Sequence, residues 1–145
     1  MYISRNMNAN DVTGKQSAKH FGTGSIRVLI VDDEEATRNY LCELLNASGC
    51  DTTAVASGEE AIQRYRCERY SIVIVDIFMP GKDGFETIME IRRSFPQARL
   101  IAITGRAEHD GLDVLGWASK IGAQRTLHKP FTPDELLYAM AEVLQ

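Results

Sequence analysis

The chain has 145 residues, a length typical of one domain. It is 44% hydrophobic and 25% charged, as in an ordinary globular protein, and its formal net charge of −4 gives no electrostatic reason to expect nucleic-acid binding. No apolar run approaches the roughly 20 residues that a membrane span needs, and the N-terminus lacks a secretory signal. Cys42, Cys50 and Cys67 are an odd number without metal-site spacing, so we expect free thiols in the cytoplasm.

Residues 1–24 are polar and rich in Asn, Ser, Thr and Gly. They follow neither the period of a strand nor that of a helix, so we predict a flexible tail there. The predicted organisation is this tail followed by one domain over residues 25–145.

Short apolar runs alternate with helical patterns from residue 26 onward. The first run, IRVLIV, is continuous and β-branched, as in a strand buried on both faces. The helical pattern after it has its leucines on one face, and Gly49 can end that helix. A weaker strand, TTAV at residues 52–55, precedes Ser57 and Glu60, which have capping-box spacing for a second helix.

The third run, SIVIV at residues 71–75, is again an apolar strand. Asp83 and Glu86 can cap a third helix, and Pro96 follows the end of that helix. The segment RLIAIT at residues 99–104 predicts a fourth strand.

Leu112, Leu115 and Ile121 indicate a fourth helix, and RTLH at residues 125–128 predicts a short fifth strand. The segment TPDE at residues 132–135 supplies an N-cap threonine, a proline at the first helical position and a capping-box acid for a fifth helix. Five repeats of strand then helix predict an α/β fold with a parallel sheet and helices on both faces. Two strand orders are common, and in the flavodoxin-like order 2-1-3-4-5 the first and third strands are neighbours at the switch point where ligands bind.

Polar side chains follow four of the predicted strands. Asp32 and Asp33 end the first strand, Asp76 the third, Thr104 the fourth and Lys129 the fifth. In the order 2-1-3-4-5 the three carboxylates meet in one crevice, where their mutual repulsion calls for protons or a cation. Mg²⁺ suits this set because it takes hard oxygen ligands and shares phosphate oxygens, so the set predicts a phosphoryl-transfer site.

Each of these residues alone has a simpler explanation. An Asp after a strand is usually a helix cap, Thr104 alone is a loop residue, and Lys129 alone is a surface charge. Only their joint placement at four strand ends favours a site.

Four segments, IRVLIVDDEE, SIVIVDIFMPGKDGFE, IAITG and LHKPFTPDEL, resemble the receiver domains of two-component response regulators, and the resemblance runs over about residues 26–144. It implies a flavodoxin-like, doubly wound, five-stranded parallel sheet in the order 2-1-3-4-5 with five helices. It also implies that Asp76 is the phosphoacceptor. Asp32, Asp33 and Asp76, with the backbone carbonyl of Phe78, would bind Mg²⁺ or, in its place, Mn²⁺.

By the same resemblance, Thr104 and Lys129 contact the phosphoryl oxygens, and the bond between Lys129 and Pro130 is cis. The chain departs from the family at Thr126, where receivers commonly carry an aromatic switch residue. For Trp117, on the predicted fourth helix, buried packing is the default expectation, and an exposed partner anchor is the alternative.

The resemblance implies that Asp76 takes its phosphoryl group from a sensor histidine kinase or a histidine phosphotransfer protein. The chain would not otherwise be an enzyme: it would catalyse only its own phosphorylation and autodephosphorylation. Output would reach a protein target through the fourth helix, fifth strand and fifth helix, with no nucleic-acid or membrane partner.

Two alternatives stay open at this point. We expect a stand-alone receiver, like those of chemotaxis, because the chain stops at Gln145 directly after the fifth helix. It could instead be the receiver fragment of a larger regulator with an output domain. An aspartyl-nucleophile phosphatase is disfavoured, because such enzymes need an Asp-x-Asp arrangement and this chain has Phe78 two residues after Asp76.

Overall fold

The structure is a computed structural model that describes residues 25–79, 81–105, 108–109 and 112–145. The predicted flexible tail, residues 1–24, lies outside the described residues. None of the helices in these ranges is both long and apolar enough to cross a membrane.

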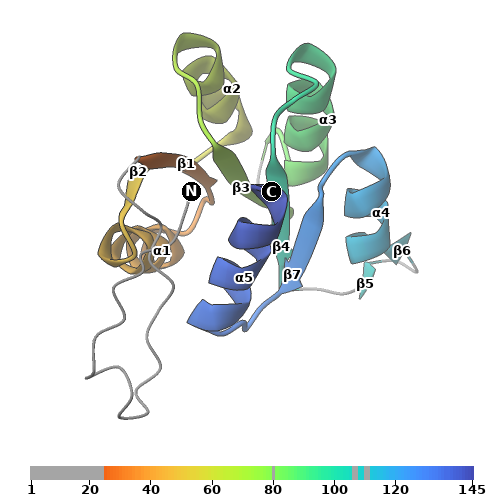
Figure 1. The fold of residues 1–145 in the computed structure, drawn as a ribbon. Coiled ribbons are helices and arrows are strands. Elements are labelled where there is room, and N and C mark those ends of the chain that lie inside the picture. Colours follow the sequence, from red (N-terminus) through yellow and green to blue (C-terminus); the bar gives the residue numbers. More distant parts are fainter. Residues whose placement is uncertain (1–24, 80, 106–107, 110–111) are drawn as a thin grey trace.

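Five parallel strands form one sheet in the order β2-β1-β3-β4-β7 (Figure 1). Their bounds are β1 Ile26–Val31, β2 Cys50–Val55, β3 Ile72–Asp76, β4 Leu100–Thr104 and β7 Arg125–His128. With β7 counted as the fifth strand, the flavodoxin-like order 2-1-3-4-5 is confirmed. A small antiparallel ribbon that the sequence did not predict, β5 (Glu108–His109) and β6 (Leu112–Asp113), lies between β4 and the next helix.

Five helices cover the two faces of the sheet. Their bounds are α1 Glu35–Ala47, α2 Gly58–Cys67, α3 Gly84–Ser94, α4 Val114–Ile121 and α5 Pro133–Val143. Alternate residues of each strand point to opposite faces, so there are two cores. Leu29 and Val31 of β1 belong to the core under α2, α3 and α4, whereas Val28 and Ile30 belong to the core under α1 and α5.

The helix starts follow the predicted caps closely. The Oγ atoms of Ser57 and Thr132 accept from the backbone N–H of the residue three positions on, and an Asp83 carboxylate oxygen does the same at α3. Only α5 has the full reciprocal capping box, because the Glu60 carboxylate at α2 accepts from the N–H of Ala56 rather than from that of Ser57. The caps therefore fix where α2, α3 and α5 begin at the carboxyl edge of the sheet.

The fourth helix differs from its prediction in two ways. Leu112 pairs with His109 in the ribbon, and the Asp113 side chain then caps α4 by accepting from the N–H of Gly116, so the helix starts after Leu112. The expectation of a buried Trp117 is wrong, because its side chain is 43% exposed. Val114 and Ala118 form the buried face of this short helix. Trp117 is adjacent to Ala118 in the sequence, but it is not part of that buried face.

Candidate functional site

The carboxylates of Asp32, Asp33 and Asp76 gather at the carboxyl edge of the sheet. Val31 of β1 and Val75 of β3 are partners in the parallel register, so the aspartates that follow them emerge side by side. Each of the three offers a carboxylate oxygen, and these atoms all lie within 4.8 Å of one another. Asp32 and Asp76 are buried, whereas Asp33 is exposed, which leaves the cluster open to solvent on one side.

Lys129 brings a cation to the same cluster. Its Nζ lies 3.5 Å from Asp32 Oδ2 and 3.8 Å from Asp76 Oδ2. The backbone supports this placement, since the N–H of Lys129 donates to the carbonyl of Thr104 at 2.8 Å, and the bond between Lys129 and Pro130 is cis. One ammonium faces three carboxylates, so the cluster keeps an excess of negative charge.

The ionisation of Asp76 reflects this excess. The pKa of Asp76 is raised from 3.8 to about 6, first by burial and then by the negative charges of Asp32 and Asp33. Lys129 and a hydrogen bond from the backbone N–H of Phe78 act in the opposite direction but do not cancel the rise. A divalent cation would relieve the same repulsion, so the donor set fits Mg²⁺, a hard cation that prefers carboxylate oxygens.

Asp32 is held in place by the start of α1. One of its carboxylate oxygens accepts from the N–H of Glu34 at 2.9 Å, and the other lies toward Lys129. Arg38, one turn into α1, donates to the backbone carbonyl of Asp32 at 2.7 Å. This role of Arg38 could not be predicted from the sequence, because it depends on how α1 packs beside β1.

Thr104 is fully buried at the end of β4, at the edge of the sheet where the carboxylates gather. Thr126 of β7 pairs with Ala102 of β4 and is half-buried. The expected switch position therefore holds a threonine in place of an aromatic ring. Phe78 is half-buried and packs against the core under α2, α3 and α4.

A groove beside the cluster was not predicted. It has a volume of about 290 Å³, and it is lined by Thr37, Tyr40, Leu41, Lys129, Pro130 and Phe131. Its two walls come from α1 and from the segment between β7 and α5, which lie far apart in the sequence, so no local pattern could reveal it.

This arrangement defines a class of site. The carboxylate of Asp76 lies among further carboxylates suited to a metal and beside the ammonium of Lys129, and the cluster opens to solvent at Asp33. Such a set can accept a phosphoryl group and offset the charge that the transfer brings in.

The chain belongs to the response regulator receiver domain family, whose profile matches residues 28–141. It is 32% identical to sporulation initiation phosphotransferase F of Bacillus subtilis, over 81% of this chain and 93% of that protein. It is also 32% identical to chemotaxis protein CheY of Thermotoga maritima, over 81% of this chain and 96% of that protein. The solved structure of response regulator TrrA of Thermotoga maritima, in complex with Mg²⁺ and BeF, has a TM-score of 0.72 and 34% identity, over 82% of this chain and 99% of that one.

Other curated relatives are longer proteins. This chain spans about half the length of several transcriptional regulators that it matches, with 50% and 48% of their lengths covered in two examples. The family membership establishes the general function: the chain is a receiver domain with a phosphoacceptor role in two-component signalling. It also removes the support for a phosphatase of another family.

Proposed function

We propose that Asp76 is the residue that accepts the phosphoryl group, from a phosphohistidine of a sensor kinase or phosphotransfer protein. An oxygen of the Asp76 carboxylate attacks phosphorus, the P–N bond to the imidazole breaks, and an acyl phosphate forms while the released imidazole takes a proton. The observation that carries this proposal is that Asp76 lies within reach of Asp32, Asp33 and Lys129 at one strand edge. The later reaction with water, which restores Asp76, would be the only other chemistry of the domain.

Asp32, Asp33 and Asp76 would hold Mg²⁺, with the backbone carbonyl of Phe78 as a further ligand and Mn²⁺ as a possible substitute. When bound, the metal would supply positive charge next to the incoming phosphoryl oxygens. The clustered oxygens of the three side chains support this assignment, as does the raised pKa of Asp76. Lys129 and the hydroxyl of Thr104 would contact the phosphoryl oxygens.

The proposed output surface comprises α4, β7 and α5. It carries two exposed aromatic side chains, Trp117 and Tyr138, and an ion pair of 2.6 Å between Arg125 Nε and a Glu142 carboxylate oxygen. Exposed aromatic residues are the usual anchors of protein–protein contacts. Because Thr126 replaces the aromatic switch, coupling from the site to this surface would depend on Thr104 and the segment that follows it.

A cytoplasmic location would suit the three free cysteines. A stand-alone role stays a prediction.

The assignment of Asp76 is tested by its phosphorylation. Incubation with acetyl phosphate and Mg²⁺ should add one phosphate to the wild-type chain, measured by intact mass, and none to Asp76→Asn. Because Asn keeps the size of the side chain, the variant should retain the fold, which circular dichroism can verify. Equal labelling of the two proteins would refute the assignment.

A further inference from the structure

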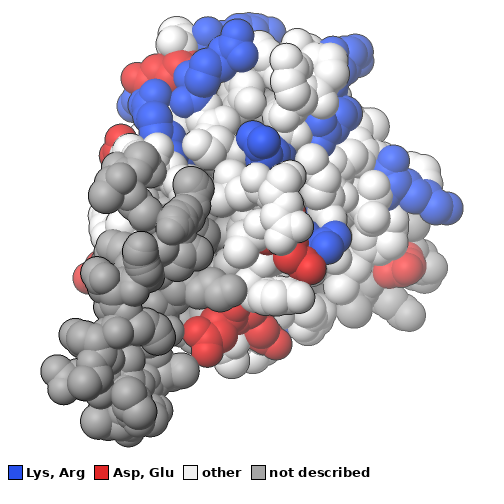
Figure 2. Space-filling model, viewed as in Figure 1, with Lys and Arg blue, Asp and Glu red and all other residues white. Residues whose placement is uncertain are grey.

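Arginines gather at the end of the molecule opposite the candidate site. Helices in this fold run antiparallel to the strands, so their C-termini lie beside the amino ends of the strands. Figure 2 shows Lys and Arg side chains over the upper part of the view, where α2 and α3 end in Figure 1. We call this surface the basic end, and it comprises Arg27, Arg64, Arg69, Arg92, Arg93 and Arg99.

Helix dipoles explain only part of this surface. Arg64 lies in the last turn of α2, and Arg92 and Arg93 lie in the last turn of α3, where a cation is stabilised by the negative end of the helix. The other three arginines are on β1, in the turn before β3 and directly before β4. Arg69 directly follows Glu68, the C-cap residue of α2, but no helix terminus accounts for Arg27 and Arg99.

A row of aromatic rings forms a continuous floor beneath the basic end. The Arg27 guanidinium lies 5.1 Å from the centre of the Tyr70 ring, in cation–π geometry. The ring of Tyr70 lies 6.1 Å from that of Tyr65, and the ring of Tyr65 lies 4.7 Å from that of Phe95. The row connects the start of β1 to the end of α3, so the arginines above it share one surface.

Three cations act on one hydroxyl in that row. Burial raises the pKa of Tyr65, and the charges of Arg69, Arg92 and Arg99 oppose the rise. These three arginines come from separate segments of the chain, yet each is near enough to influence the same group. Their positive potentials therefore add at this end of the molecule.

Two carboxylates near the basic end, those of Asp51 and Glu68, already form ion pairs with Arg27. Arg27 Nη2 lies 2.9 Å from a carboxylate oxygen of Glu68, and Arg27 Nε lies 3.8 Å from one of Asp51. In contrast, Arg69 and Arg93 are exposed, and neither forms an ion pair with another residue in the described parts of the chain. Their charges are available to a ligand.

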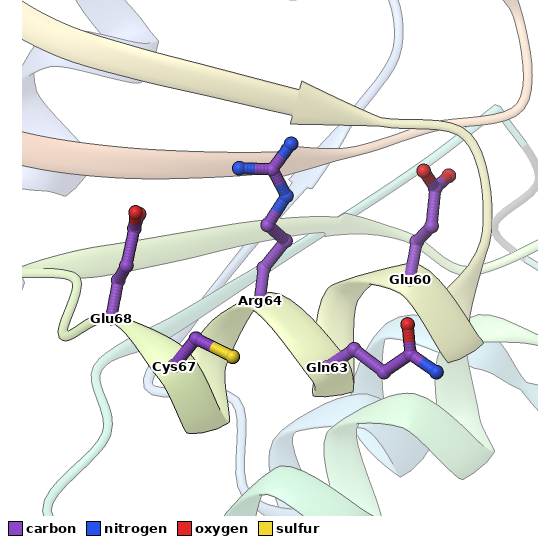
Figure 3. Close-up of a pocket in the computed structure, with 5 residues that line it drawn as sticks. All are labelled: Glu60, Gln63, Arg64, Cys67 and Glu68. Carbon is purple, nitrogen blue, oxygen red and sulfur yellow. The ribbon is translucent and has the colours of Figure 1, made fainter.

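A hollow of about 350 Å³ along α2 extends this surface (Figure 3), and it is lined by Glu60, Gln63, Arg64, Cys67 and Glu68. Both of its carboxylates have partners: Glu60 accepts from the N–H of Ala56, and Glu68 accepts from Arg27 and Tyr70. The hollow therefore offers the guanidinium of Arg64 next to carboxylates that are already neutralised or hydrogen-bonded.

We propose that the basic end is a docking surface for a carboxylate-rich segment of a partner protein. Guanidinium groups match carboxylates through paired, charge-assisted hydrogen bonds, so exposed arginines suit this ligand. The surface is far from Asp76, so docking here would leave the phosphorylation site accessible.

Two other polyanions fit the surface less well. Single-stranded nucleic acid needs exposed rings for its bases, and the rings of Tyr65 and Tyr70 are only 5% and 6% exposed. A long polyanion would also meet the net charge of −4 of the whole chain. An anionic membrane is held best when several apolar side chains enter it, and among the described residues Met89 is the only exposed large hydrophobic one on an element of the basic end.

The test is the binding of a fluorescently labelled oligoglutamate peptide to the full chain, followed by anisotropy at low and at physiological salt. The double variant Arg69→Gln/Arg93→Gln should bind about tenfold more weakly than wild type. The matched control, Ala36→Glu/Asn39→Glu, makes the same change in net charge on exposed positions of α1 and should bind like wild type. Both double variants should still be phosphorylated by acetyl phosphate, so this test is independent of the assignment of Asp76.

Three results would overturn the proposal. The first is the absence of specific peptide binding, seen either as no binding by wild type at low salt or as equal losses of affinity in the two double variants. The second is tighter binding of a single-stranded oligonucleotide of equal charge, which would assign the surface to nucleic acid. The third is self-association of the wild type that the Arg69→Gln/Arg93→Gln change abolishes, which would make a second copy the occupant.

Discussion

The chemistry of the site at the residue scale is set by an imbalance of charge. Asp32 and Asp76 are buried with one ammonium, that of Lys129, between them, and Asp33 adds a third negative group at the surface. Burial, and then the charges of Asp32 and Asp33, raise the pKa of Asp76 from 3.8 to about 6. In the absence of metal, ionised Asp76 destabilises the fold, and a bound cation or an added proton removes this cost.

The pH dependence of stability should reveal this cost. Because the pKa of Asp76 is higher in the folded state, folding favours its protonated form, and this contribution is full below about pH 4 and is lost as the pH rises through 6. Asn mimics the protonated side chain at every pH. With a chelator present, Asp76→Asn should therefore melt at a higher temperature than wild type at pH 8, and the difference should shrink by pH 4.5. A difference that is the same at both pH values would contradict the raised pKa.

Metal binding should depend on Asp33. Replacing it with Ala removes one proposed ligand and one negative charge from the cluster, while the buried pair of Asp32 and Asp76 stays in place. The affinity for Mg²⁺ should fall at least about tenfold, which corresponds to about 1.4 kcal/mol. Isothermal titration measures this directly, and an unchanged affinity would place the metal elsewhere.

The residue types of the site could be predicted from the sequence because each follows an apolar run that is recognisable as a strand. The raised pKa of Asp76 could not, since it depends on burial and on distances between strands. The exposure of Trp117 was also missed, because it depends on which residues of α4 face the sheet, and in so short a helix the apolar pattern leaves that face undetermined.

Tight contact between β3 and α3 positions the site at the element scale. The N–H of Gly84, the first residue of α3, donates to the carbonyl of Ile77 at 2.8 Å. A Cβ atom at Gly84 would collide with the carbonyl oxygen of Asp76 and would lie 2.5 Å from the Cα of Ile77. Both are backbone atoms that cannot rotate away, so α3 can approach the end of β3 only because residue 84 is Gly.

Gly84→Ala should consequently destabilise the protein and disturb Asp76. The added methyl group forces α3 away from β3, and we expect a loss of about 1–3 kcal/mol in the free energy of unfolding, measured with urea. Phosphorylation by acetyl phosphate should slow as well. Gly105→Ala is the matched control, because nothing lies within 4 Å of a Cβ atom there. If the two changes lowered the free energy of unfolding equally, the close contact between α3 and β3 would not be the reason that position 84 needs glycine.

The ends of the helices and strands show which local sequence signals were sufficient to predict where an element begins. The caps of α2, α3 and α5 were predictable because the capping residues act within a few positions of themselves. The ribbon of β5 and β6 was not, since two strands of two residues each have no periodicity to detect. Leu112 consequently reads as helical in the sequence although it lies in a strand.

At the scale of the whole molecule, β4 connects the proposed phosphorylation site at the end of β3 to the proposed output surface around β7. Asp76 ends β3, Thr104 ends the adjacent β4, and the carbonyl of Thr104 accepts from the N–H of Lys129 after β7. Residues 105–113 connect Thr104 to α4. A phosphoryl group that drew the hydroxyl of Thr104 toward Asp76 would therefore act on the segment that leads into α4.

Trp117 is the only tryptophan of the chain and lies on α4 with 43% of its side chain exposed, so its fluorescence reports on this helix. Addition of beryllofluoride with Mg²⁺, which imitates the phosphoryl group, should change the Trp117 emission of wild type and leave that of Asp76→Asn unchanged. Thr104→Ala should still accept phosphate from acetyl phosphate, measured by intact mass, but should show a smaller change in emission. If Thr104→Ala responds as fully as wild type, the signal reaches α4 by a route other than Thr104. If wild type is phosphorylated without any change in emission, α4 is not part of the response, and the output surface must be sought elsewhere on the domain.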